Sequence, residues 1–457
     1  MKRQERIVLN NIIIDTGKKY LIMNLINFRR EYVNEEQLKM MRFIGNKKFA
    51  KEKLLDKEQA FYEELLAKRQ VLTDEMISMY EEKRKEMELE KLEIQPYINS
   101  IVINLSYKCN FKCDYCYQKG FSANERMTEE KVEALYIFLK DYAKKCDKPF
   151  RLESITISGG EPLLDENVNA VKCILNRFDK ICKNFVLYTN GALLTRQMDK
   201  IDFSKITSLQ ISIDGNDEVM KTINHNQKNN LLDNILKSID VLKRDKKRKI
   251  TIPIMLCEVV VENIQNLIKE FEKHDLFSAD NVGIYVLPDL NFDEGDRMQC
   301  LYKDGEEYIR LNNRVKDKIK EKNIQIGHPR SISAFYKALI RQSDEQWQGK
   351  AISCSMSGII PVTFGPEGNV YWCTCVDQEK GIIGKYYPDA YIDECRIQEY
   401  RKRTIYSQEE CQKCEFRYVC GGGCRLNLIA NNTKLDCGLW NDQYFLENVE
   451  RFFSWGR

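Results

Sequence analysis

The 457-residue sequence lacks a long apolar run and an excess of charge of one sign. No stretch of 18 apolar residues occurs, and the longest candidate, Ile252–Val261, is interrupted by Glu258, which excludes a membrane-spanning helix. The N-terminal MKRQERIVLN has neither an apolar stretch nor a small-residue cleavage site, so we expect no signal peptide. With 72 basic and 69 acidic residues, bulk charge does not favour nucleic-acid binding. We therefore expect a cytoplasmic protein that binds neither nucleic acid nor membrane.

Cysteine, in contrast, is abundant. The chain has 17 cysteines, an odd number, and a reducing cytoplasm disfavours a disulfide framework. Three of them lie within eight residues, at 109–116, and eight lie between Cys373 and Cys437 inclusive. Buried structural cysteines would be scattered, so this clustering indicates bound metal.

Residues 1–97 are predicted to form a small α+β module. Ile7–Ile14 and Tyr20–Leu25 have the composition of two strands, joined by a turn at Asp15-Thr16-Gly17. Helical spacing of apolar residues follows in three segments, which are Glu35–Phe43, Glu58–Lys68 and Thr73–Leu92. Thr73 is the expected N-cap of the third helix, and Pro96 ends the module.

Residues 98–330 are predicted to form the core domain, in which strands and helices alternate. The predicted strands are Ile101–Ser106, Ile155–Gly160, Phe185–Gly191, Leu209–Gly215, Ile250–Val259 and Val282–Pro288. Helical patterns lie near 129–144, 167–178, 193–200, 229–243, 262–273 and 305–322. Six such units predict a parallel sheet that is open or curled into a partial barrel, with functional loops beyond the carboxyl ends of its strands.

Residues 331–457 are predicted to form a third domain. Periodicity is weak from about Ala351 onward, and the segment is dense in cysteine, glycine and aromatic residues. Such a composition is typical of a small domain that is held together by metal rather than by a large apolar core.

The first cysteine cluster has the spacing C-x3-C-x2-C, formed by Cys109, Cys113 and Cys116. Three thiolates on one loop can hold three corners of an iron–sulfur cube, whose full ligation by protein needs four cysteines. One iron is then left open, as a catalytic metal site requires. The alternatives are a structural zinc loop or three incidental core cysteines.

This loop, with Tyr115 before its last cysteine, resembles that of radical S-adenosylmethionine (SAM) enzymes. The resemblance continues through Gly159-Gly160-Glu161-Pro162 and covers about residues 100–290. It implies a partial (β/α)6 TIM-like barrel of the α/β class. It also implies that the open iron binds the amino and carboxylate groups of SAM, and that one electron cleaves the sulfonium to yield a 5′-deoxyadenosyl radical.

The resemblance assigns roles to individual residues. It implies that Cys109, Cys113 and Cys116 ligate a [4Fe-4S] cluster. The residues it places at the cofactor are Tyr115, Gly159, Gly160, Glu161, Asn190, Ser212 and Asp214. Of these, the Gly-Gly-Glu segment would receive the methionyl ammonium, in agreement with the affinity of carbonyl and carboxylate oxygens for such a group.

The sequence departs from the family at one position. Many relatives carry an arginine about ten residues after the Asp-Gly that contacts the methionyl carboxylate. Here that stretch reads Thr222-Ile223-Asn224-His225, which leaves the contact to Asn224 or to another residue.

The C-terminal cysteines resemble the seven-cysteine SPASM domain, which binds two auxiliary four-iron clusters. By motif position, the ligands of one cluster would be Cys411, Cys414, Cys420 and Cys437. Three corners of the other would be held by Cys354, Cys373 and Cys424. Cys375 would supply the fourth ligand, or that iron is open to substrate. A zinc ribbon is the alternative interpretation.

The N-terminal module resembles the small winged-helix module with which peptide-maturing enzymes bind a leader peptide. The leader would add a strand to an exposed sheet edge. A plain helical extension that packs on the barrel is the alternative.

Together these features predict a radical SAM/SPASM peptide maturase that cross-links a ribosomal peptide through a thioether or a carbon–carbon bond. The implied cofactors are SAM and three [4Fe-4S] clusters, and the implied partners are a precursor peptide and an electron donor such as flavodoxin or ferredoxin. One alternative is a sulfatase-maturase-like dehydrogenase, disfavoured because Thr374 stands where those relatives have an aspartate. The other is a non-enzymatic zinc-binding adaptor.

Overall fold

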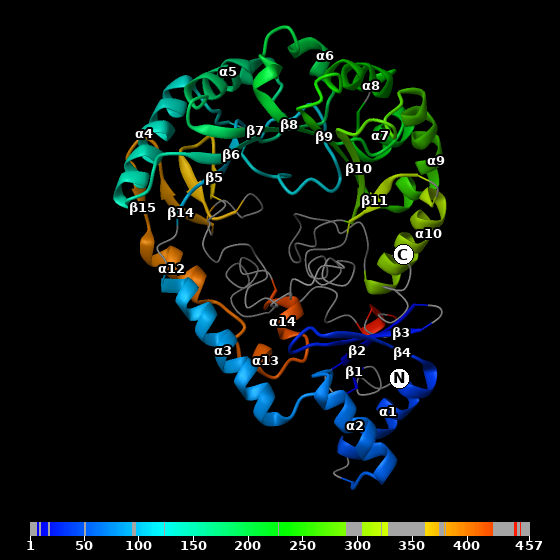
Figure 1. Cartoon of the computed structure of the whole chain (residues 1–457). Coiled ribbons are helices and arrows are strands. Elements are labelled where there is room, and N and C mark those ends of the chain that lie inside the picture. The colour runs from blue at the N-terminus through cyan, green and yellow to red at the C-terminus, as the bar shows by residue number, and fades with distance from the viewer. Residues whose placement is uncertain are drawn as a thin grey trace.

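The computed structural model in Figure 1 describes most of the chain. The described residues are 7–8, 11–16, 19–49, 52–93, 97–122, 124–226, 228–288, 304–320, 322–327, 362–373, 379, 381–423, 443–445 and 448. Within them the strands form two sheets, one of four strands near the N-terminus and one of eleven strands. Among the described helices, none is both long enough and apolar enough to cross a bilayer.

The large sheet is built around a run of parallel strands. Their order is β11-β10-β9-β8-β7-β6-β5, and each pairs in parallel with its neighbour. Their bounds are β5 Ser100–Asn104, β6 Leu152–Ser158, β7 Cys182–Thr189, β8 Ile206–Ile211, β9 Lys249–Met255, β10 Val282–Leu287 and β11 Ile324–Ile326. Most of them are short runs rich in Ile and Val, and buried residues recur along each of the longer strands, as expected of strands that line a core.

Helices alternate with these strands and cover the outer side of the sheet (Figure 1). Their bounds are α4 Glu129–Lys145, α5 Val168–Arg177, α6 Leu194–Gln197, α7 Asp217–Ile223, α8 Leu231–Leu242, α9 Glu258–Lys273 and α10 Gly305–Ile319, with 3-10 turns at Asp165–Asn167 and Phe203–Lys205. In Figure 1 the strands from β5 to β11 follow an arc with these helices on its convex side. The predicted α/β class is confirmed, and the arc agrees with a partial barrel.

The boundary between β9 and α9 differs from the prediction. The strand was expected to continue to Val259, but β9 ends at Met255 and α9 begins at Glu258. The predicted strand included Cys257. In the structure Cys257 instead directly precedes helix α9. The buried residues of α9 recur at helical spacing, namely Val260, Val261, Ile264, Leu267, Ile268 and Phe271. Burial of this face outweighs the strand propensity of the consecutive valines.

The large sheet continues beyond β5 into the C-terminal part of the chain. The added strands are β12 Val362–Phe364, β13 Asn369–Tyr371, β14 Ile382–Lys385 and β15 Tyr391–Ile392. β12 pairs with β5 in parallel, and the strands after it pair with one another antiparallel. Up to residue 423, where the continuous described segment ends, the helices that follow are α12 Glu394–Lys402, α13 Glu409–Gln412 and α14 Arg417–Cys420. β5 thus lies inside the sheet, with a parallel neighbour on each side.

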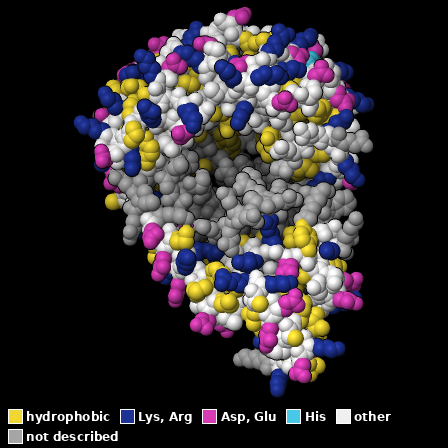
Figure 2. All heavy atoms as spheres, in the orientation of Figure 1, with side chains coloured by type: hydrophobic (Ala, Val, Ile, Leu, Met, Phe, Trp, Pro, Cys, Tyr) yellow, Lys and Arg dark blue, Asp and Glu magenta, His cyan; other side chains and the backbone are white. Residues whose placement is uncertain are grey.

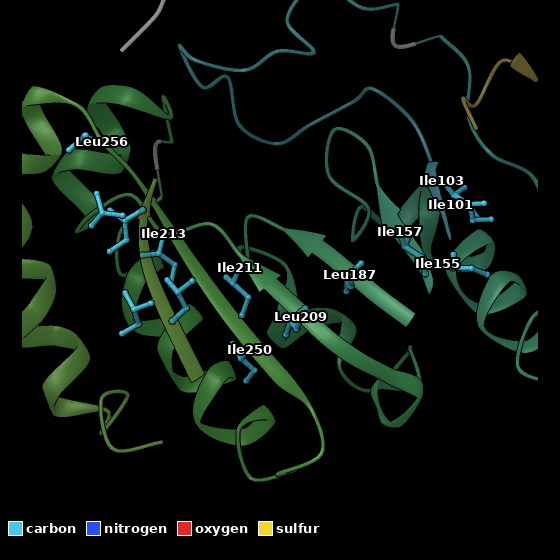
Figure 3. Close-up of a cluster of buried hydrophobic side chains, with 14 of the residues drawn as sticks. Ile101, Ile103, Ile155, Ile157, Leu187, Leu209, Ile211, Ile213, Ile250 and Leu256 are labelled. Carbon is cyan, nitrogen blue, oxygen red and sulfur yellow. The ribbon is translucent and has the colours of Figure 1, made fainter. Parts of the chain in front are cut away.

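The apolar core of the large sheet lies between its strands and the covering helices. Figure 3 shows part of this core, in which alternate residues of adjacent strands meet. The register pairs Ile101 with Ile155 and Ile103 with Ile157, and all four side chains are buried. Because side chains alternate between the faces of a strand, this register fixes which residues face the core.

The N-terminal sheet is antiparallel, in the order β1-β2-β3-β4. Its strands are β1 Ile7–Val8, β2 Asn11–Asp15, β3 Tyr20–Asn24 and β4 Arg30–Val33. It is followed by helices α1 Glu35–Phe49, α2 Asp56–Ala67 and α3 Asp74–Glu93. The predicted strand over residues 7–14 is thus two short strands. The Met76 N–H donates to Thr73 Oγ1 over 3.3 Å, which confirms Thr73 as the cap of α3.

The two faces of this sheet belong to different cores. Ile12 and Met23 belong to the main core of the molecule, whereas Ile13 and Ile22 pack in a second core with residues of α1 and α2. The split follows from the strand period of two, because neighbouring residues point to opposite faces. The N-terminal module is therefore packed against the rest of the chain.

Arg84 in α3 connects this module to the C-terminal helices. Its Nη2 donates to the Ile26 carbonyl over 2.8 Å, and its guanidinium lies 5.5 Å from the Phe28 ring centroid and 4.2 Å from that of Tyr418 in α14. On the same helix, Glu81 pairs with Arg417. Helix α3 therefore contacts both the N-terminal sheet region and α14.

Replacing Arg84 should loosen this connection. In Arg84→Met the apolar stem stays, but the hydrogen bond and both cation–π contacts are lost, which should cost about 1–3 kcal/mol of stability. Hydrogen exchange should quicken in residues 24–28 and in α14. Lys85→Met, at the adjacent exposed position, is the control and should leave exchange unchanged; equal protection in both variants would contradict the assignment.

Candidate active site

The loops that follow successive parallel strands meet at one edge of the sheet. The cysteine loop follows β5, the Gly-Gly-Glu segment follows β6, Thr189-Asn190-Gly191 ends β7, and Ser212–Gly215 follows β8. Figure 2 shows this face of the molecule hollowed beneath the arc of strands, with acidic and basic side chains interspersed over its surface. The carboxyl edge of the sheet is where α/β folds place their ligands.

The Gly-Gly-Glu segment packs directly on the chain that leads into the first cysteine. Gly160 N–H donates to the Ser106 carbonyl over 2.7 Å, and Glu161 N–H donates to the Lys108 carbonyl over 2.8 Å. Gly159 has a φ of +133°, a conformation that favours glycine. A Cβ on Gly160 would lie 2.0 Å from the Lys108 carbonyl oxygen. Two glycines are needed here because the two backbones touch.

The side chain of Glu161 is buried, with 1% of its surface exposed. One carboxylate oxygen accepts from Leu163 N–H over 2.9 Å and from the Thr189 hydroxyl over 2.8 Å, and the other accepts from Asn190 N–H over 2.9 Å. Burial raises the pKa of Glu161 to about 7, although these hydrogen bonds oppose the shift. Glu161 therefore links the loop after β6 to the end of β7.

Asn190 extends this link to the cysteine loop. Its side-chain amide donates to Asn110 Oδ1 over 2.9 Å and approaches Cys109 Sγ at 3.7 Å, while its own Oδ1 accepts from Ala192 N–H over 3.0 Å. Sequence reasoning selected Asn190 but not Asn110, because a residue between two cysteines carries no signal of its own. The structure thus brings Asn190 and Cys109 together.

The three thiols of the cysteine loop influence one another. Desolvation raises the pKa of Cys113 to about 12 and raises that of Cys116, and repulsion among the three sulfurs adds to the rise at Cys113. Cys109 also has a raised pKa, of about 11, but it is an exposed residue, so the desolvation argument rests on the other two. Thiolates at these positions require compensating positive charge.

N–H groups around the three sulfurs can stabilise negatively charged thiolates. Phe111 N–H donates to Cys109 Sγ over 3.3 Å, the Asn224 amide donates to Cys113 Sγ over 3.1 Å, and the backbone of Gln118 and Lys119 hydrogen-bonds Cys116 and lowers its pKa. N–H donors aimed at cysteine sulfurs are typical of iron–sulfur sites. The residues present therefore fit a cluster with three cysteine ligands.

No set of three or more His, Cys, Asp or Glu side chains in the described part of the chain converges on a position for a single metal ion. An iron–sulfur cube does not need such convergence on one ion, because each cysteine ligates a different iron atom of the cluster.

Tyr115 of the cysteine loop, which is half-buried, pairs with the buried Asp214. The Tyr115 hydroxyl donates to Asp214 Oδ2, and Met255 N–H at the end of β9 donates to Asp214 Oδ1 over 3.1 Å. Desolvation raises the pKa of both side chains. Ser212 was selected with Asp214, and it is half-buried, with its N–H bound to the Thr189 carbonyl over 3.0 Å. Both oxygens of Asp214 thus already accept hydrogen bonds from the protein.

Of the predicted C-terminal cluster ligands, the structure describes Cys373 and three that lie close together in the sequence. Cys411 lies in α13, Cys414 N–H donates to the Cys411 carbonyl over 3.0 Å, and Cys420 ends α14. A Cβ on Gly422 would lie 3.9 Å from Cys411 Sγ, so the chain turns back toward Cys411 after α14. Four further predicted ligands, Cys354, Cys375, Cys424 and Cys437, lie outside the described residues, as does Thr374.

Comparison with known families identifies the central part of this fold. Residues 103–271 match the family model of the Radical SAM superfamily, so the chain carries a radical SAM domain. A protein of Methanocaldococcus jannaschii named "Probable GTP 3′,8-cyclase" is 32% identical over 148 residues, which is 32% of this chain and 46% of that protein. The chain thus spans less than half the length of this curated relative.

Two solved structures have a similar fold over most of the chain. Streptococcus suis SuiB bound to the precursor peptide SuiA has a TM-score of 0.51 and 17% identity, covering 93% of this chain and 96% of that one. The protein anSMEcpe with bound AdoMet and the Cp18Cys peptide has a TM-score of 0.53 and 16% identity, covering 79% and 97%. At such identities the likeness concerns the fold.

The contact at Gly160 yields a direct prediction. In Gly160→Ala the new methyl group would overlap the Lys108 carbonyl, so one backbone must move, at a cost of about 1–3 kcal/mol. Iron bound per chain should fall, because Cys109 follows directly. Gly120→Ala is the control: its φ of +89° adds strain, but apart from its chain neighbours no atom of the described residues lies within 4 Å of the added Cβ. Iron retained in the first variant, or lost equally in both, would contradict this role.

The buried carboxyl of Glu161 predicts a pH dependence. Its pKa is about 7 in the fold against 4.5 ordinarily. The folded chain therefore binds the proton more tightly, and the free energy of unfolding should fall as pH rises through this window, by at most about 1.4 kcal/mol per unit. Glu161→Gln should remove this slope in anaerobic denaturant unfolding without SAM. The exposed Glu166→Gln should retain it, and an unchanged slope in Glu161→Gln would refute the assignment.

Proposed function

We propose that the chain is a SAM-dependent radical enzyme that matures a ribosomally made peptide by forming an oxidative cross-link, either a thioether or a carbon–carbon bond. The observation that carries the proposal is the contact between the cysteine loop and the Gly-Gly-Glu loop, at the carboxyl edge of a curved parallel sheet. The radical SAM match over residues 103–271 supports the chemistry, and the peptide-bound fold relatives support the substrate class.

Within the proposal, Cys109, Cys113 and Cys116 hold a [4Fe-4S] cluster. When bound, this cluster supplies the open iron for SAM and the electron that cleaves its sulfonium bond. The desolvated thiols favour tight ligation, because an iron ion compensates the charge that burial disfavours. The N–H groups directed at the sulfurs hold the ligands in place.

The residues around SAM divide into two groups. Gly159 and Gly160 offer backbone carbonyls, and Asn190 and Ser212 lie at the edge of the site, where they can reach the methionyl and ribose groups. Glu161 has two oxygens with three protein donors between them, which leaves acceptor capacity for the methionyl ammonium. Asp214 also accepts three protein hydrogen bonds, and because one of them comes from the Tyr115 hydroxyl we assign it to the support of Tyr115.

The C-terminal cysteines are proposed to hold two auxiliary clusters. Cys411, Cys414 and Cys420 would bind one together with Cys437. Cys373 would bind the other together with Cys354 and Cys424, and either Cys375 is its fourth ligand or that iron is open to substrate. Cross-linking removes two hydrogen atoms from the peptide. One would pass as a hydrogen atom to the 5′-deoxyadenosyl group that SAM supplies. The other would leave as a proton and an electron, and an auxiliary cluster would accept the electron. A flavodoxin or ferredoxin would supply the reducing electron.

The N-terminal sheet is proposed to bind the leader of the precursor peptide. β4 pairs with β3 along one side, and within the described residues no strand pairs with its other side. Arg30 and Tyr32 of β4 are exposed. An extended peptide can add to such an edge through backbone hydrogen bonds.

A second candidate substrate is a nucleotide. It rests on the 32% identity to the protein named "Probable GTP 3′,8-cyclase", which is higher than the identity to either peptide-bound structure. The fold relatives cover far more of the chain, which is why the peptide is preferred.

The first test is the metal content of protein reconstituted without oxygen. We expect about 12 irons per chain, falling to about eight in the variant with Cys109, Cys113 and Cys116 replaced by alanine. With SAM and a reductant, only the unmutated protein should release 5′-deoxyadenosine. About two zinc ions with little iron would instead support the zinc-binding adaptor and overturn the proposal.

The substrate is tested by co-expression with a short peptide encoded beside the gene. A loss of two hydrogen atoms per link in the mass of the peptide is the expected result, and the triple-cysteine variant should leave the mass unchanged. Consumption of GTP with an unaltered peptide would favour the nucleotide instead.

A further inference from the structure

Asn224, directly after α7, is bound to the cysteine loop by its side chain. It is 3% exposed, and its Nδ2 lies 3.1 Å from Cys113 Sγ, 2.9 Å from Asp214 Oδ2 and 3.1 Å from the Tyr115 hydroxyl. The carboxylate of Asp214 can only accept, so the amide nitrogen must face it. Asn224 Oδ1 is buried without a hydrogen-bond partner among the described residues. The contacts of the nitrogen therefore determine how this side chain is oriented.

The backbone around Asn224 holds the same loop. Lys112 N–H donates to the Asn224 carbonyl over 3.1 Å, and Asp114 N–H donates to the Ile223 carbonyl over 3.0 Å. These two bonds lie on either side of Cys113. The neighbouring His225 ring nitrogen adds a contact of 2.7 Å with Asp114 Oδ1. Residues 223–225 therefore fix both the backbone and the sulfur of Cys113.

The Tyr115–Asp214 pair connects this contact to the sheet. Asp214 is 4% exposed and is bound at Oδ1 by the backbone of β9. Its Oδ2 receives both Asn224 and Tyr115. Removing the Asn224 amide would leave the buried Asp214 carboxylate with one donor fewer, which is costly. Asp214 thus holds the Asn224 amide in place next to Cys113 Sγ.

We propose that Asn224 is a positioning residue that donates a hydrogen bond to the Cys113 ligand and so raises the reduction potential of the SAM-binding cluster. The inference rests on the proposed function, because it requires Cys113 to ligate that cluster. A donor to a ligating sulfur stabilises the reduced state, which carries more negative charge, over the oxidised one. The amide nitrogen has only two protons for three protein acceptors, so it is not free to bind the SAM carboxylate.

The test compares two buried asparagines of the same loop. Asn224→Leu keeps the approximate shape but removes the donor. Asn226→Leu is the matched control, since Asn226 is 4% exposed and its side chain contacts the backbone of Lys228 but no cysteine. Each full-length protein is reconstituted without oxygen, and its clusters are titrated electrochemically with detection by electron paramagnetic resonance. The relevant signal is the one that is lost in the triple-cysteine variant and altered by added SAM.

In Asn224→Leu this signal should appear at a more negative potential, by roughly a tenfold change in the reduction constant, or about 59 mV for one electron. Asn226→Leu should titrate as the unmutated protein does. Loss of about four irons from Asn224→Leu alone would also support the positioning role. An unchanged potential with full iron content would overturn the inference, as would equal iron loss in both variants.

Failure of the inference and failure of the proposed function give different results. If the unmutated protein binds the SAM-responsive cluster and Asn224→Leu titrates identically, only the role of Asn224 is refuted. If the unmutated protein has no such signal, the proposed function itself fails.

Discussion

The parallel pairing of β5 with β6 on one side and β12 on the other is the constraint on which the site depends. It makes the cysteine loop leave the sheet at the same edge as the loops after β6, β7 and β8. Ile101 and Ile103 are buried on one face of β5, and a slip of one residue would turn them to the opposite face. The register of a five-residue strand therefore determines where Cys109 meets the Gly-Gly-Glu loop.

Two buried carboxyl groups then join the strand ends into one rigid edge. Glu161 links the loop after β6 to the end of β7, and Asp214 links the end of β8 to β9 and to Tyr115. Charged groups are rarely buried, because desolvation costs more than most hydrogen bonds return. Apolar residues would be more stable at both positions, but they could not hold loop backbones through directed bonds. The site thus gains fixed geometry at a cost in stability.

Much of this arrangement could be predicted from the sequence, because it depends on local periodicity. Alternating strand and helix patterns indicated the parallel sheet, and strand ends in a parallel sheet must share an edge. β12 could not be predicted, because three residues carry no readable period. Asn224 was considered only as a substitute for a missing arginine, because its contacts with Cys113 and Asp214 join segments far apart in sequence. Tertiary contacts of single polar residues leave no periodic signal.

One helix, α3, contacts both the segment after β3 of the N-terminal sheet and the helix that carries C-terminal cysteine Cys420. Arg84 of α3 contacts Phe28, which follows β3, and Tyr418 of α14. Cys414 and Cys420 flank this contact in sequence, and the Cys414 carbonyl is itself bound by Arg417. A peptide held at β4 would therefore be anchored to the same scaffold as the proposed auxiliary ligands, rather than to a module that moves independently. A primary carbon radical can abstract hydrogen from many C–H bonds within its reach, so selectivity for one position requires that the substrate be held in place relative to the site, and the contacts of α3 supply a connection of this kind.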